Sequence, residues 1–145
     1  MTVVPNPERD PFLERWNAFY ERVHDVAATL ALYPIEGSAE RVRLGMPLRP
    51  EITQPAGMFS APAMFGLADI AGTWLAMENV PDDTFPLAVQ SSINVVSNAR
   101  EGDAIANATL VRAGRTIIVT DTRVESDAGV LLANIVTTYV VTPRR

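Results

Sequence analysis

Residues 60–78 read SAPAMFGLADIAGTWLAME, and this stretch decides the fold. Ser60 followed by Pro62 is typical of a helix start, because serine caps free N–H groups and proline is tolerated in the first turn. Apolar side chains then recur at helical spacing on one face: Met64, Leu67, Ala71, Trp74 and Leu75. Asp69 is the only charged side chain between residues 61 and 77. We therefore predict a long, largely buried helix that carries one carboxylate.

The flanking sequence predicts one helix before this segment and strands on both sides of it. Asp10 and Pro11 open an amphipathic helix over residues 7–33, which ends near Tyr33 and Pro34. Residues 39–49 alternate as a strand, with Val42, Leu44 and Met46 on one face. Four further strands are predicted, over 86–97, 104–112, 116–125 and 130–141, joined as a meander. The fold class is thus α+β in a single domain, residues 1–145, with its core over 39–141.

Composition narrows the classes of function. The chain has 145 residues, of which 48% are hydrophobic and 20% charged, with a net charge of −5 and no cysteine. An acidic domain without a basic run is not expected to bind nucleic acid, where affinity depends on neutralising phosphates. The nearly charge-free stretch 58–77 keeps a carboxylate at its centre, which disfavours a membrane span. The N-terminus lacks the pattern of a signal peptide, so we expect a cytoplasmic protein.

Four segments resemble the phenylacetate-type acyl-CoA thioesterases of the hotdog fold, in which a curled antiparallel sheet wraps around one helix. Residues 57–71, GMFSAPAMFGLADIA, are similar to the family segment in which His-Gly-Gly opens the helix and Leu-Ala-Asp follows. Residues 93–103, INVVSNAREGD, are similar to an Asn-rich strand followed by Pro-Ala-Arg-Glu-Gly-Asp. Residues 110–119 and 126–141 resemble the last two hairpins. The likeness covers residues 40–141 and implies the hotdog fold with an added N-terminal helix.

The resemblance also implies a catalytic site. Asp69 would act as general base or nucleophile, while Ala61, through its N–H, and Gln54 would polarise the thioester carbonyl. The family triplet is replaced by Ser60, Ala61 and Pro62, so the imidazole is absent. Because the helix start of one hotdog subunit faces the Asp of its neighbour, the site implies a homo-oligomer, a dimer or a dimer of dimers. No metal or redox cofactor is implied, and coenzyme A enters only as part of the acyl-CoA substrate.

Several residues keep two interpretations. Asp69 is either catalytic or a buried carboxylate that fixes a subunit interface. Substrate-binding positions are expected at Ser60, Phe59, Phe65, Thr73 and Arg115. Gly66 and Gly72 favour close packing over ligand approach, and the lone His24 is expected on a helix surface. The alternative function is a non-catalytic hotdog protein that binds acyl groups or serves a structural role. A hotdog hydratase is disfavoured, because Trp74 stands where that branch carries a histidine.

Overall fold

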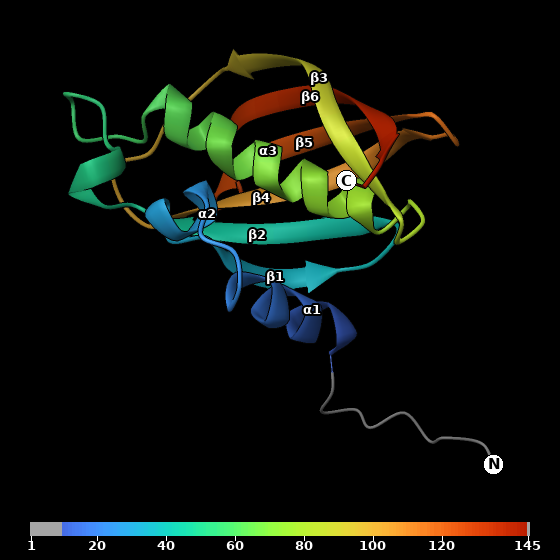
Figure 1. Cartoon of the computed structure of the whole chain (residues 1–145). Coiled ribbons are helices and arrows are strands. Elements are labelled where there is room, and N and C mark those ends of the chain that lie inside the picture. The colour runs from blue at the N-terminus through green and yellow to red at the C-terminus, as the bar shows by residue number, and fades with distance from the viewer. Residues whose placement is uncertain (1–9, 145) are drawn as a thin grey trace.

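The central helix α3 (Ala61–Met77) lies against a six-stranded antiparallel sheet that curls around it (Figure 1). The computed structural model describes residues 10–144. The Ser60 hydroxyl accepts a hydrogen bond from the N–H of Ala63 at 3.3 Å, so the predicted N-cap is confirmed. The whole predicted apolar face is buried. This is the arrangement that the hotdog resemblance implies.

Close packing explains both glycines of α3. A Cβ atom at Gly72 would lie 2.7 Å from the Tyr139 hydroxyl and 2.9 Å from Thr120 Oγ1. At Gly66 it would lie 2.7 Å from a methyl carbon of Leu30. Both glycines therefore let α3 approach its neighbours, as expected from the sequence.

The strand order corrects the predicted meander. The strands are β1 (Tyr33–Gly37), β2 (Arg41–Pro47), β3 (Thr84–Val95), β4 (Asp103–Ala113), β5 (Ile117–Ser126) and β6 (Leu131–Pro143). They lie in the order β1-β2-β4-β5-β6-β3, so β3 pairs with β6 at one edge and β4 pairs with β2 (Figure 1). Only β4, β5 and β6 form a meander. The segment 96–102 is not a tight hairpin, and it carries the chain from the β3 edge to β4 on the opposite side of β5 and β6.

The predicted N-terminal helix is two shorter helices separated by a turn. Helix α1 spans Pro11–Tyr20 and α2 spans Val26–Thr29, while residues 7–9 lie outside the described part. The break arises because the Asp25 side chain accepts from the N–H of Ala27 at 2.8 Å and starts a new helix. Tyr33, the last residue of the expected helix, is instead the first residue of β1, which pairs with β2. His24 is exposed, as expected, but it lies in the turn between the two helices and not on a helix surface.

Helix α1 packs through aromatic side chains on the face of α3 that Trp74 occupies. The Trp74 ring lies 5.6 Å from Phe12, 5.3 Å from Trp16 and 5.3 Å from Phe19, measured between ring centroids. Helix α3 is thus covered by the sheet on one side and by α1 at its C-terminal half. Within residues 10–144, no helix combines the length and the apolarity that crossing a membrane requires.

Candidate active site

The start of α3 presents a free hydrogen-bond donor. Ala61 is exposed, and none of the described residues accepts a hydrogen bond from its N–H. The next two donors are accounted for, because Pro62 has no N–H and the N–H of Ala63 is bound to Ser60. A free N–H at the positive end of a helix dipole favours negative charge, such as that on the oxygen of a tetrahedral intermediate. The Ala61 N–H is therefore free to donate a hydrogen bond to a group bound at the start of α3.

Gln54 lies in the loop between the short helix η1 (Pro50–Ile52) and α3. Its backbone N–H donates to Met58 O at 2.8 Å, and its side-chain oxygen accepts from the N–H of Ala56. The oxygen is therefore held by the loop itself. The side-chain NH₂ group has no acceptor among the described residues. It is therefore free to donate a hydrogen bond to a carbonyl oxygen.

Two residues that sequence reasoning did not assign to the site hold this loop. Asn98 accepts from the N–H of Phe59 at 3.1 Å and donates to Phe59 O at 2.8 Å, so its amide pairs with both backbone groups of Phe59. Arg100 donates to Ala56 O at 2.9 Å. These contacts anchor the chain directly before the N-cap Ser60. The sequence contained a sign of this role, since Asn98 stands where the resembled motif has proline.

Asp69 lines an open cavity between α3, the first half of β3 and the end of α1. The cavity has a volume of about 300 Å³, and apolar side chains dominate its wall. Burial raises the pKa of Asp69 above its ordinary value of 3.8, and within residues 10–144 no donor or cation is paired with its carboxylate. An unpaired, half-buried carboxylate with a raised pKa is suited to accept a proton or to attack an acyl carbon.

A layer of hydroxyl groups surrounds the Tyr139 hydroxyl, which is close enough to Asp69 to be affected by its charge. Thr73 donates to the Tyr139 hydroxyl at 3.3 Å, and Ser91 bonds Thr137 at 2.8 Å. Burial, and less strongly the charge of Asp69, raises the pKa of Tyr139 to about 12. Tyr139 therefore stays a neutral phenol near the carboxylate. Thr73, expected at the substrate, contacts this layer and also lines the cavity.

One chain does not bring the carboxylate and the free donor together. Ala61 and Asp69 lie on the same straight helix, where a rise of 1.5 Å per residue separates them by about 12 Å along the axis. A thioester carbonyl bound at Ala61 is thus out of reach of the same chain's Asp69.

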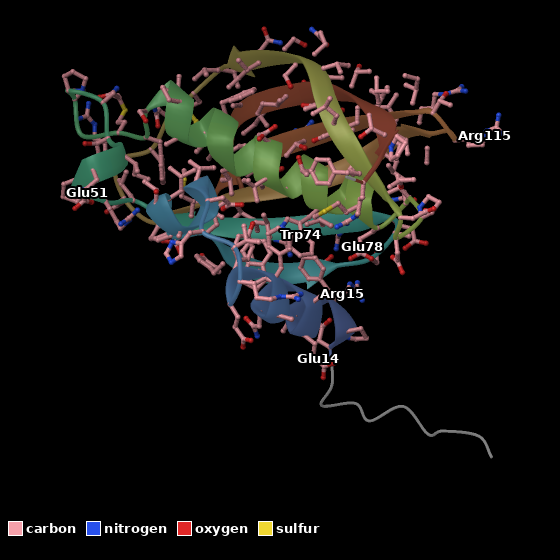
Figure 2. All side chains as sticks on the ribbon, viewed as in Figure 1. Glu14, Arg15, Glu51, Trp74, Glu78 and Arg115 are labelled. Atoms are coloured by element: carbon pink, nitrogen blue, oxygen red, sulfur yellow. The ribbon has the colours of Figure 1, made fainter. Side chains whose placement is uncertain are left out.

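The remaining predicted residues lie in different environments. Phe59 is fully buried in the core, and Phe65 is half-buried on α3. Arg115 is exposed at the tip of the β4–β5 hairpin, distant from the labelled Trp74 (Figure 2). In the described part of the chain, no cluster of three or more His, Cys, Asp or Glu side chains has metal-binding geometry.

Comparison with known proteins agrees with this architecture. The profile of the thioesterase superfamily matches residues 56–133. A thioesterase from Haemophilus influenzae is 19% identical, with 90% of each chain covered and a TM-score of 0.84. A mutant thioesterase from Pseudomonas aeruginosa is 23% identical, with 94% of this chain and 98% of that chain covered and a TM-score of 0.84. A thioesterase family protein from Silicibacter pomeroyi is 23% identical, with 92% and 99% covered and a TM-score of 0.82.

No curated protein gave a match. The matched segment contains the helix start, Asp69 and the strands from β3 to the first part of β6, and the three solved structures share the fold over nearly the whole chain. The chain therefore has the hotdog fold and belongs to the thioesterase superfamily.

Proposed function

We propose that this protein hydrolyses acyl-CoA thioesters, with Asp69 as general base or nucleophile. The observation that carries the proposal is the state of Asp69, which is half-buried in an apolar cavity without a described partner. A carboxylate kept for structure is expected to be paired, because an unpaired buried charge is costly. The cost is explained if the group is needed for chemistry.

In the general-base form of the reaction, Asp69 takes a proton from water while the water oxygen attacks the thioester carbon. The carbonyl oxygen becomes an oxyanion, which the Ala61 N–H and the Gln54 NH₂ group stabilise. The intermediate then collapses, the carbon–sulfur bond breaks, and the sulfur leaves with the proton returned from Asp69. The products are the carboxylic acid and free coenzyme A. No metal or redox cofactor takes part in these steps.

The proposed site is shared between two copies of the chain. Asp69 and Ala61 are about 12 Å apart along one helix, so a second chain has to supply one of them. The outer edge of β3 is available for pairing, and it carries the exposed apolar side chains Leu87, Val89 and Val95. A two-fold dimer at this edge would form two equivalent sites, each with Asp69 from one chain and Ala61 from the other.

A complementation experiment tests this mechanism. Asp69→Asn removes the base, and Ala61→Pro removes the N–H donor while Ser60 already has the extended conformation that a following proline requires. Each variant alone should lose at least about 10²-fold in kcat for thiol release from acyl-CoA. Ala61→Gly keeps the N–H and serves as the matched control, with near wild-type activity.

Mixing the two inactive variants should restore activity. After dissociation and random reassociation, half of the dimers are mixed and each has one intact site, so about a quarter of wild-type activity is expected. Persistent inactivity of a mixture shown to contain mixed dimers would exclude the shared site. A fully active Asp69→Asn variant would exclude the mechanism.

The second candidate is an acyl-binding hotdog protein without turnover, and Pro62 favours it. Proline removes a donor from the first turn of α3, which leaves Ala61 as the free backbone donor there. Binding of acyl-CoA thioesters without release of thiol would support this alternative and contradict hydrolysis.

A further inference from the structure

Two cavities lie along α3, and one pair of aromatic side chains separates them. The first contains Asp69 and has a volume of about 300 Å³. The second has a volume of about 380 Å³ and lies where the end of α3 meets α1 and the C-terminal strand, near Met77 and Val80. Phe19 and Trp74 line both cavities and form the partition between them. Figure 2 shows Trp74 in this region, between α3 and α1.

Contacts from both α1 and α3 hold the partition in place. The rings of Phe19 and Trp74 meet edge to face, with centroids 5.3 Å apart and an angle of 76° between the planes. Trp74 is only 5% exposed, and its Nε1 donates to the Tyr20 hydroxyl at 3.4 Å. The Arg15–Glu78 ion pair, at 2.6 Å, joins α1 to the end of α3 beside the second cavity. The aromatic pair is therefore part of the α1–α3 packing.

The position of the partition limits the length of the acyl group that the Asp69 cavity can hold. Trp74 follows Asp69 on α3, and the helical rise places it about 7.5 Å further along the axis. Asp69, Phe19 and Trp74 line the same cavity, so an acyl group whose carbonyl carbon lies at Asp69 meets the partition within this cavity. The first cavity by itself is at the lower end of the range of about 300–1,000 Å³ that ligand pockets occupy. Joined to the second cavity, it would more than double in volume.

We infer that Phe19 and Trp74 restrict the substrate to a compact acyl group, a short chain or a single ring, by closing the Asp69 cavity at its far end. The inference rests on the proposed hydrolysis and adds the residues that determine acyl length. Phe19 comes from α1, outside the segment that matches the superfamily profile. Selectivity for acyl length is thus shared between the N-terminal helix, through Phe19, and α3, through Trp74, while the chemistry is assigned to the hotdog core.

The test compares chain-length profiles of Phe19→Ala and Phe19→Leu with that of the wild type. The substrates are acetyl-, butanoyl-, hexanoyl-, decanoyl- and phenylacetyl-CoA, assayed as full-length protein for thiol release. Wild type should prefer butanoyl, hexanoyl or phenylacetyl groups. In Phe19→Ala, the ratio of kcat/KM for decanoyl-CoA to that for butanoyl-CoA should rise about tenfold or more, with a smaller rise for Phe19→Leu.

Phe12→Leu is the matched control for loosened α1 packing. Phe12 contacts Trp74 and is buried, yet it lines neither cavity, so its variant should keep the wild-type profile. An unchanged profile in Phe19→Ala, or an equal shift in Phe12→Leu, would overturn the partition and leave hydrolysis intact. A preference of wild type for decanoyl-CoA would also overturn the partition and leave hydrolysis intact.

A binding measurement separates this inference from the proposed reaction. Calorimetric titration with non-hydrolysable acyl-CoA thioethers of the same lengths needs no turnover. If wild type releases no thiol, hydrolysis is refuted, and the thioether series then tests the partition alone. Tighter binding of the decanoyl thioether by Phe19→Ala than by wild type supports the partition, and equal binding refutes it.

Discussion

Asn98→Ala should loosen the start of α3, because the Asn98 amide binds both backbone groups of Phe59. The variant removes an acceptor at 3.1 Å from Phe59 N and a donor at 2.8 Å from Phe59 O. The Phe59 side chain is completely buried, so its backbone groups are difficult to reposition. A buried polar group left without a partner costs about 1–3 kcal/mol. Both hydrogen bonds are only partly buried, so water offsets part of this and about 2–3 kcal/mol in total is expected.

Thermal and chemical unfolding measure this loss. For a domain of this size, about 2–3 kcal/mol corresponds to a Tm lower by roughly 5–10 °C. Asn98→Asp is the matched variant, since it keeps the acceptor for the Phe59 N–H but loses the donor to Phe59 O, and it should lie between wild type and Asn98→Ala. The displaced helix start should also lower kcat, because the Ala61 N–H moves away from the oxyanion position.

Two results would refute this reasoning. An Asn98→Ala protein with a free energy of unfolding within about 0.5 kcal/mol of wild type would show that the amide does not anchor Phe59. A destabilised variant with unchanged kcat would show that the loop does not position the carbonyl site. If Asn98→Asp had the kcat of wild type but remained destabilised, the effect on catalysis and the effect on stability would be independent of each other.

Three further predictions concern Asp69, Gly72 and the edge of β3. Burial raises the pKa of Asp69, so the folded protein binds its proton more tightly than the unfolded chain; stability from this group is present below pH 3.8 and is lost as pH rises through the raised folded pKa. Asp69→Asn should therefore be more stable than wild type at neutral pH. Measured by urea titration, its free energy of unfolding should fall less than that of wild type as pH rises from 3.8 through the raised pKa. An Asn variant less stable than wild type at pH 7 would contradict this prediction. Gly72→Ala places a Cβ 2.7 Å from the Tyr139 hydroxyl, and overpacking of about 1–3 kcal/mol should exceed the gain of about 1 kcal/mol in helix propensity. A higher Tm for Gly72→Ala would show that the α3–sheet contact yields easily. Val89→Lys places a charge on the exposed edge of β3 and should give a folded monomer without thiol release, measured by sedimentation and circular dichroism; an active monomer would disprove the shared site.

Local chemistry was sufficient to predict α3 and its ends. Ser60 and Pro62 act within a single turn, and the apolar spacing from Met64 to Leu75 is a property of the helix itself, so both are legible in the sequence. The turns that join β4, β5 and β6 are equally local, and their hairpins were predicted correctly. The position of Asp69 in the middle of the buried helix follows from the same pattern.

Local sequence patterns could not predict which strands pair with each other. A strand pattern shows which face of β3 is apolar but not which strand it joins, and β3 pairs with β6 and not with β4. The break between α1 and α2 was missed because the apolar spacing continues through it, while the Asp25 cap that causes it resembles an ordinary charged position of an amphipathic helix.

By itself, the sequence determined one buried helix with a capped start, a single carboxylate and a set of strands to cover it, because capping, periodicity and turn formation are interactions between near neighbours. Only the tertiary structure decided what surrounds that carboxylate. The Asn98–Phe59 contact, the hydroxyl layer at Tyr139 and the Phe19–Trp74 partition each join residues far apart in the chain. Such contacts depend on how α1, α3 and the sheet pack together, and packing is set by the whole fold.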